Sequence, residues 1–155
     1  MESDLDYMKL ALQEAESAYA KDEVPVGSVI VSATGELLSL SHNLKELNQD
    51  PTAHSEVLAI RDAAAKLQSW RLNDCTLFVT LEPCSMCMGA IVHARIKRLV
   101  FGAYDIKGGA MTCGLNIHNN SKLNHVVSVE GGILNYECGQ LLSQFFKEKR
   151  SRHKV

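Results

Sequence analysis

Apolar residues recur along the chain with two different spacings, one typical of helices and one typical of strands. A first amphipathic helix, ending before Pro25, is predicted from apolar residues three or four positions apart, namely Leu5, Met8, Leu12, Ala15 and Tyr19. Ser3 and Asp6 stand three residues apart at its start, as the two members of a capping box do. The chain is therefore expected to open with a capped helix.

The rest of the chain alternates between β-rich runs and helical patterns. Strands are predicted at residues 26–31, 37–40, 76–81, 97–103 and 125–129, and helices at residues 52–68, 85–94 and 136–150. Thr52 is a suitable N-cap for the second helix, and Pro83 separates a buried strand from the helix that follows it. This order predicts a three-layer α/β/α fold with one central mixed five-stranded sheet.

The composition fits one compact domain over residues 1–155. The chain is 46% hydrophobic and 22% charged, which is typical of a globular protein with a sizeable core. Its polar start does not resemble a secretory signal, and no apolar run approaches the roughly 18 residues that span a bilayer. We therefore expect a cytoplasmic protein without a membrane segment.

Charge and cysteine content narrow the function classes. Lys and Arg number 16 and Asp and Glu number 18, so the net charge of −2 leaves only a local basic patch for nucleic acid. A basic C-terminal tail at about residues 147–155 is the candidate patch. The cysteines number five, and this odd count argues against a disulfide framework and leaves the thiols available as metal ligands.

Two short motifs carry the candidate chemistry, H-x-E at residues 54–56 and P-C-x-x-C at residues 83–87. Cys84 and Cys87 lie three positions apart at the start of a predicted helix, so their sulfurs point to one side. The positive end of the helix favours thiolates, and Zn²⁺ binds thiolate and imidazole readily. The combination matches the signature of zinc-dependent nucleobase deaminases.

His54 would supply the third ligand from a separate helix. Three protein ligands leave the fourth tetrahedral position of a single zinc ion for water, whose pKa the metal lowers to near neutral. Glu56 lies two residues past His54 and so on another helical face. We therefore expect Glu56 to be the catalytic proton carrier and not a metal ligand.

The cysteine pair alone would also suit a redox centre or a structural zinc site. A redox pair leaves the H-x-E motif unexplained, and a structural site needs a fourth ligand. His93 should face away from Cys87 on the same predicted helix, while Cys75 and Cys113 are more typical of core and loop positions. The pattern favours a catalytic site.

Residues 7–150 resemble the cytidine-deaminase-like superfamily and, within it, the bacterial tRNA-specific adenosine deaminases. The resemblance is carried by residues 23–27, 43, 50–56, 79–84, 100–103, 105, 107, 124–125, 131–134 and 141–146. The zinc motif indicates the superfamily, and the later segments indicate the tRNA branch. The metal site that the resemblance implies consists of the residues already described, His54, Cys84, Cys87 and Glu56.

The resemblance also implies substrate contacts. Asn43 would hold a flipped purine through its amide, although it also suits an ordinary turn. Asp105 would contact the neighbouring nucleotide, although it equally suits a loop cap. Ser55 stands where the family usually has Ala, and its backbone is the expected contact. Residues 111–114 also depart from the family's usual small-residue run, which affects the expected shape of a loop near the RNA.

The resemblance implies hydrolytic deamination of adenosine to inosine at the wobble position (34) of a tRNA anticodon loop. Such a loop offers unstacked bases to an enclosed site. It further implies a homodimer, and it favours phosphate contacts by the basic tail. Two alternatives remain open: a guanine or cytidine deaminase acting on a free base or nucleoside, and a non-catalytic RNA-binding subunit with structural zinc.

Overall fold

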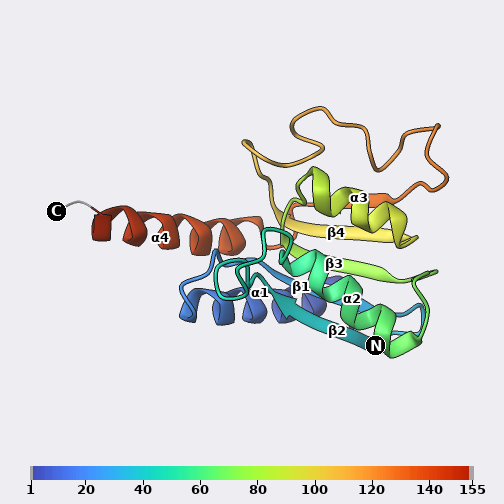
Figure 1. Ribbon diagram of the computed structural model, residues 1–155, viewed down its shortest axis with the longest axis horizontal. Coiled ribbons are helices and arrows are strands. Elements are labelled where there is room, and N and C mark those ends of the chain that lie inside the picture. Colours follow the sequence, from blue (N-terminus) through green and yellow to red (C-terminus); the bar gives the residue numbers. More distant parts are fainter. Residues whose placement is uncertain (1, 154–155) are drawn as a thin grey trace.

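The computed structural model describes residues 2–153, where four helices cover the two faces of a five-stranded sheet (Figure 1). In chain order the elements are α1 (Asp4–Ala20), β1 (Gly27–Val31), β2 (Leu37–His42), α2 (Ser55–Leu67), β3 (Thr76–Leu81), α3 (Ser85–His93), β4 (Arg98–Ala103), β5 (Ser128–Gly131) and α4 (Asn135–His153). Ser3 is the N-cap of α1 and forms a capping box with Asp6, as the sequence predicts.

The strands lie in the order β2-β1-β3-β4-β5, with both parallel and antiparallel pairs. β1 runs antiparallel to β2, its hairpin partner, and to β3. β4 runs parallel to β3 and to β5, and α3 makes the crossover that a parallel β3–β4 pair requires. The mixed five-stranded sheet expected from the sequence is confirmed.

Alternate residues of each strand face different helices. Val29 of β1 belongs to an apolar cluster with Tyr7 of α1, whereas its neighbour Ile30 belongs to a second cluster with Ala59 of α2 and Met88 of α3. The fourth helix, α4, contacts β3, β4 and α1. The helices therefore form one layer on each side of the sheet, and the predicted three-layer α/β/α arrangement is confirmed.

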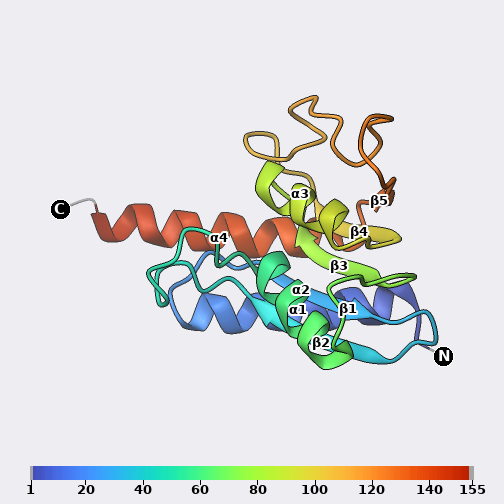
Figure 2. The same cartoon turned by 45° about the vertical axis from the view of Figure 1, so that its right-hand side comes forward.

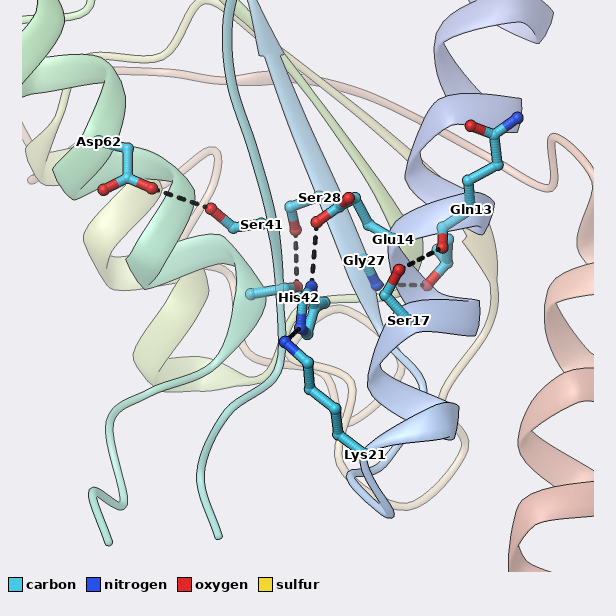
Figure 3. A network of polar contacts seen from close by, with 11 residues as sticks. Gln13, Glu14, Ser17, Lys21, Gly27, Ser28, Ser41, His42 and Asp62 are labelled. Carbon is cyan, nitrogen blue, oxygen red and sulfur yellow. Dashed lines mark hydrogen bonds and ion pairs between the residues drawn. The ribbon is translucent and has the colours of Figure 1, made fainter. Parts of the chain in front are cut away.

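Helix α1 fixes the end of β2, from which the loop toward α2 departs. A Cβ atom at Gly27 would lie 2.0 Å from the carbonyl oxygen of Ala11, so glycine allows the helix to pack directly on β1. His42 lies between Glu14 and Lys21, with its Nδ1 3.0 Å from Glu14 Oε1 and its Nε2 2.9 Å from Lys21 Nζ (Figure 3). These contacts hold the residue just before Asn43.

Two predicted boundaries are wrong for identifiable reasons. The N-cap of α2 is His54 and not Thr52, because Asp50 accepts hydrogen bonds from both the backbone N–H and the hydroxyl of Thr52. The last strand begins at Ser128 and not at residue 125. At residue 125 the histidine ring makes a contact outside the strand ladder: Nε2 of His125 lies 2.6 Å from the Ile96 carbonyl oxygen.

Helix α4 is longer than the predicted helix at residues 136–150. Its C-terminal part projects beyond the sheet (Figures 1 and 2), and Phe145 packs edge-to-face on Tyr19 of α1 with ring centroids 5.6 Å apart. The predicted basic tail is thus helical as far as His153, and Lys154 lies outside the described residues. Within residues 2–153 there is no helix of the length and apolar character needed to cross a membrane.

Candidate active site

The side chains of His54, Cys84 and Cys87 meet where α2 and α3 begin. His54 is the N-cap of α2 and Cys84 the N-cap of α3, and Cys87 lies in the first turn of α3. The two helix starts lie side by side at the end of the sheet where β3 ends (Figure 1). Ligands that are far apart in the sequence are brought together because both helices begin at this end of the sheet.

The geometry of the three side chains fits a tetrahedral zinc ion. Their ligand atoms all lie within 4.8 Å of one another. His54 Nδ1 is 3.7 Å from Cys84 Sγ and 3.4 Å from Cys87 Sγ. Ordinary zinc–sulfur and zinc–nitrogen bond lengths place two such ligand atoms about 3.6 Å apart. The predicted ligands are therefore close enough to share one ion, and the donor set is one that zinc prefers.

The two thiols have different proton affinities. A hydrogen bond from Cys87, reinforced by His54, lowers the pKa of Cys84 to about 4 despite partial burial. The same hydrogen bond between the two thiols, together with burial, raises the pKa of Cys87. A thiolate at Cys84 would attract a cation, and a metal ion held by both sulfurs would have to displace the proton of Cys87.

Glu56 is buried beside this group without belonging to it. Desolvation raises the pKa of its carboxyl group, and its side chain is only 4% exposed. The Ser55 hydroxyl donates to Glu56 Oε1 at 2.9 Å, and the Ser28 hydroxyl lies 2.7 Å from that of Ser55. From the sequence only the backbone of Ser55 was expected to contribute, so this hydroxyl contact was missed.

A cavity of about 170 Å³ lies over the site. It is lined by Val24, Val26, Asn43, Lys45, His54, Ser55, Glu56, Leu81, Glu82, Cys84 and Asp105. Every predicted site residue except the fully buried Cys87 therefore borders one cavity. Its size is below that of pockets for drug-sized ligands, which suits a single ring system.

Asn43 and Asp105 both take part in local hydrogen bonds at the rim. Asn43 Nδ2 donates to the Val24 carbonyl at 3.2 Å, and its Oδ1 accepts from Lys45 N–H at 3.1 Å. One amide hydrogen and one lone pair are left for a ligand. Asp105 Oδ1 accepts from two backbone N–H groups, those of Lys107 and Gly108. It has the geometry of a loop cap and also borders the cavity.

A wider hollow of about 690 Å³ adjoins the cavity and extends along α4. Val24, Leu81 and Asp105 line both spaces. The remaining lining residues are Ala103, Tyr104, Ile106, Lys107, Gly139, Leu142, Ser143, Phe146 and Arg150. The enclosed site therefore opens into a larger surface that carries aromatic, apolar and basic groups.

Comparison with known proteins places these features in a family. Residues 2–150 match the model of the MafB19-like deaminase family. The chain is 46% identical to a tRNA-specific adenosine deaminase of Bacillus subtilis (strain 168), over 100% of this chain and 96% of the relative. A tRNA-specific adenosine deaminase of Haemophilus influenzae is also 46% identical, over 99% of this chain and 89% of the relative.

Two solved structures are similar as well. One comes from studies of A-to-I editing by tRNA:A34 deaminases and shares 43% identity, with a TM-score of 0.84 over 88% of this chain and 98% of that chain. The other is a guanine deaminase from Bacillus subtilis, with 30% identity and a TM-score of 0.62 over 93% of this chain and 92% of that chain.

Proposed function

Because this chain belongs to the family of the tRNA-specific adenosine deaminases, we propose that it converts adenosine to inosine at the wobble position, A34, of a tRNA anticodon loop. The observation that carries the proposal is the meeting of His54, Cys84 and Cys87 beside buried Glu56, under a cavity sized for one ring system. The reaction consumes water and releases ammonia.

One zinc ion per chain would be held by His54, Cys84 and Cys87. When bound, zinc supplies the Lewis acidity that lowers the pKa of a water molecule to near neutral. The thiolate of Cys84 and the imidazole of His54 are already oriented toward a shared point, which reduces the reorganisation required on metal binding.

Glu56 would carry the protons of the reaction. It would accept a proton from the attacking water and deliver it to the purine ring nitrogen. It would then take the second proton of the added hydroxyl group and pass it to the amino group, which leaves as ammonia. Its raised pKa suits this double role, because the group must act as a base and then as an acid near neutral pH. The Ser55 hydroxyl can donate to the carboxylate and accept from the carboxylic acid, so it can support both forms.

Asn43 would hold the base with the amide hydrogen and lone pair that its rim contacts leave free. The wider hollow supports a polymeric substrate over a free base, because a free base has no further nucleotides to place there. Three of its large side chains are well exposed, Tyr104 at 54%, Ile106 at 83% and Phe146 at 41%. Aromatic faces and basic groups of this kind bind the bases and phosphates of single-stranded RNA.

The test is a comparison of substrates at equal enzyme concentration. A synthetic anticodon stem-loop, free adenosine, guanine and cytidine are each incubated with the zinc-loaded protein, and the products are identified by mass spectrometry. We expect inosine within the stem-loop at position 34. Faster conversion of a free base or nucleoside than of the stem-loop would contradict the proposal, as would failure to convert any of them.

The basic end of α4 is expected to contribute salt-dependent RNA binding, but its residues are not equivalent. Arg150 lines the wider hollow, whereas Arg152 is paired with Asp22 at 2.8 Å. Arg150→Ala should therefore weaken stem-loop binding and reduce the slope of log Kd against log salt by about 0.7 for each phosphate that the guanidinium neutralises. Fluorescence anisotropy at several salt concentrations measures this slope, with Lys9→Ala, at an exposed position of α1, as control. An unchanged slope would contradict the predicted phosphate contact.

Homodimer formation and a cytoplasmic location complete the proposal. Exposed apolar side chains lie on α3 and on the segment between β4 and β5, including Met86, Leu115, Leu123 and Val126. They offer a surface for a second copy of the chain. Sedimentation analysis of the purified protein decides between monomer and dimer. The cytoplasmic location rests on the proposed tRNA substrate.

A further inference from the structure

We propose that Glu82 is a positioning residue: it holds the loop that carries Asp105 against the pocket and thereby controls binding of the nucleotide next to the reacting adenosine. This inference rests on the RNA substrate proposed above. It concerns a residue outside the metal ligands and the proton carrier, one position beyond the end of β3.

Glu82 is a buried carboxylate whose hydrogen-bond donors come from one loop. It is 2% exposed, and its Oε1 accepts from the Asp105 N–H at 3.1 Å, while Oε2 accepts from the Thr112 N–H at 2.8 Å. The Thr112 hydroxyl donates to it as well. None of the ion pairs found within residues 2–153 involves Glu82. A buried charge of this kind is stable only while its donors stay in place, so carboxylate and loop fix each other.

The backbone reinforces the same connection. Glu82 N–H donates to the Ala103 carbonyl at 2.8 Å, and Ala110 N–H donates to the Pro83 carbonyl at 2.9 Å. A Cβ atom at Gly109 would lie only 2.2 Å from the Glu82 carboxyl carbon, so the loop backbone rests directly on the carboxylate. The two residues that lead into the metal ligand Cys84 therefore also carry the loop of residues 104–112.

This loop presents groups to the wider hollow and supplies no catalytic atom. Asp105 lines both the cavity and the hollow, and exposed Tyr104 and Ile106 line the hollow alone. The metal ligands and Glu56 belong to the starts of α2 and α3. A displaced loop should therefore weaken binding of the flanking nucleotide and leave the maximal rate of deamination nearly unchanged.

The experiment compares variants that act on the two sides of the contact. Glu82→Gln keeps the shape but loses the charge, Thr112→Val removes only the hydroxyl donor, and Gly109→Ala pushes the loop away from the carboxylate. Glu16→Gln, at an exposed position of α1, is the matched control. Single-turnover rates are measured against enzyme concentration on stem-loops with each of the four bases beside the target adenosine, and zinc content is measured for every variant.

We expect Glu82→Gln and Gly109→Ala to raise the enzyme concentration that gives half the maximal single-turnover rate. The expected increase is about tenfold, the size of effect that loss of a hydrogen bond to a charged group produces. The maximal rate should stay within about twofold while the preference for one flanking base weakens, with a smaller effect for Thr112→Val. An unchanged half-saturating concentration in zinc-loaded Gly109→Ala and Thr112→Val would overturn the proposal. A greatly reduced maximal rate with unchanged half-saturation in zinc-loaded Glu82→Gln would also overturn it. Failure of the wild type and of Glu16→Gln to produce inosine would instead refute the proposed function.

Discussion

Glu56→Gln is expected to lower the single-turnover rate on a stem-loop by about a thousandfold while zinc stays bound, because the amide cannot accept a proton from water. The substitution preserves side-chain shape and can still accept the Ser55 hydrogen bond. Zinc content by elemental mass spectrometry and inosine yield by product analysis are measured on the same sample.

The contrast between retained zinc and a strongly reduced single-turnover rate identifies the role of Glu56. Loss of the metal along with activity would make Glu56 a structural support of the site, since it is buried directly beside the ligands. Wild-type turnover in a zinc-loaded Glu56→Gln sample would eliminate it as the proton carrier.

Cys87→Ala is expected to remove zinc and activity together. Cys87 is fully buried and is one of only three protein side chains in the described metal group. Two remaining ligands hold zinc far more weakly, so zinc per chain should fall from about one to near zero after dialysis against a mild chelator.

Cys113→Ser provides the matched control, because Cys113 is an exposed cysteine outside the metal group. It should retain zinc and turnover under the same dialysis. Stoichiometric zinc in Cys87→Ala would show that another ligand completes the site and would contradict the assignment of the three ligands.

The metal group was predictable because its signals are local. Cys84 and Cys87 lie three positions apart, close to one helical turn, and the short H-x-E motif supplies the imidazole and the carboxylate. Strands β1 to β4 were predictable for a similar reason, since a local run of apolar residues marks each of them, whereas β5 contains only one apolar residue. Sequence alone supports parallel pairing only where a helix joins two strands, as α3 joins β3 and β4.

The errors arise where a competing contact, either close by or distant in the sequence, overrides the preference of the residue type. Thr52 is a suitable N-cap by residue type, but Asp50 accepts hydrogen bonds from both its hydroxyl and its N–H. Glu82 was missed as a site residue because its partners, Asp105 and Thr112, lie 23 and 30 positions further along the chain. Nothing in the residues around Glu82 reveals that it is buried or which groups donate to it.

Neither helix that delivers a metal ligand has a capping side chain. His54 and Cys84 occupy the N-cap positions of α2 and α3, and neither makes the side-chain hydrogen bond usual there. A Ser, Thr or Asp in each place would add about 1 kcal/mol to stability. The protein forgoes that stabilisation at two neighbouring helix ends. The positive ends of their dipoles instead favour negative charge on Glu56, in the first turn of α2, and on the thiols at the start of α3. Capping stabilisation is therefore absent from both helix starts because their N-cap positions hold the candidate metal ligands.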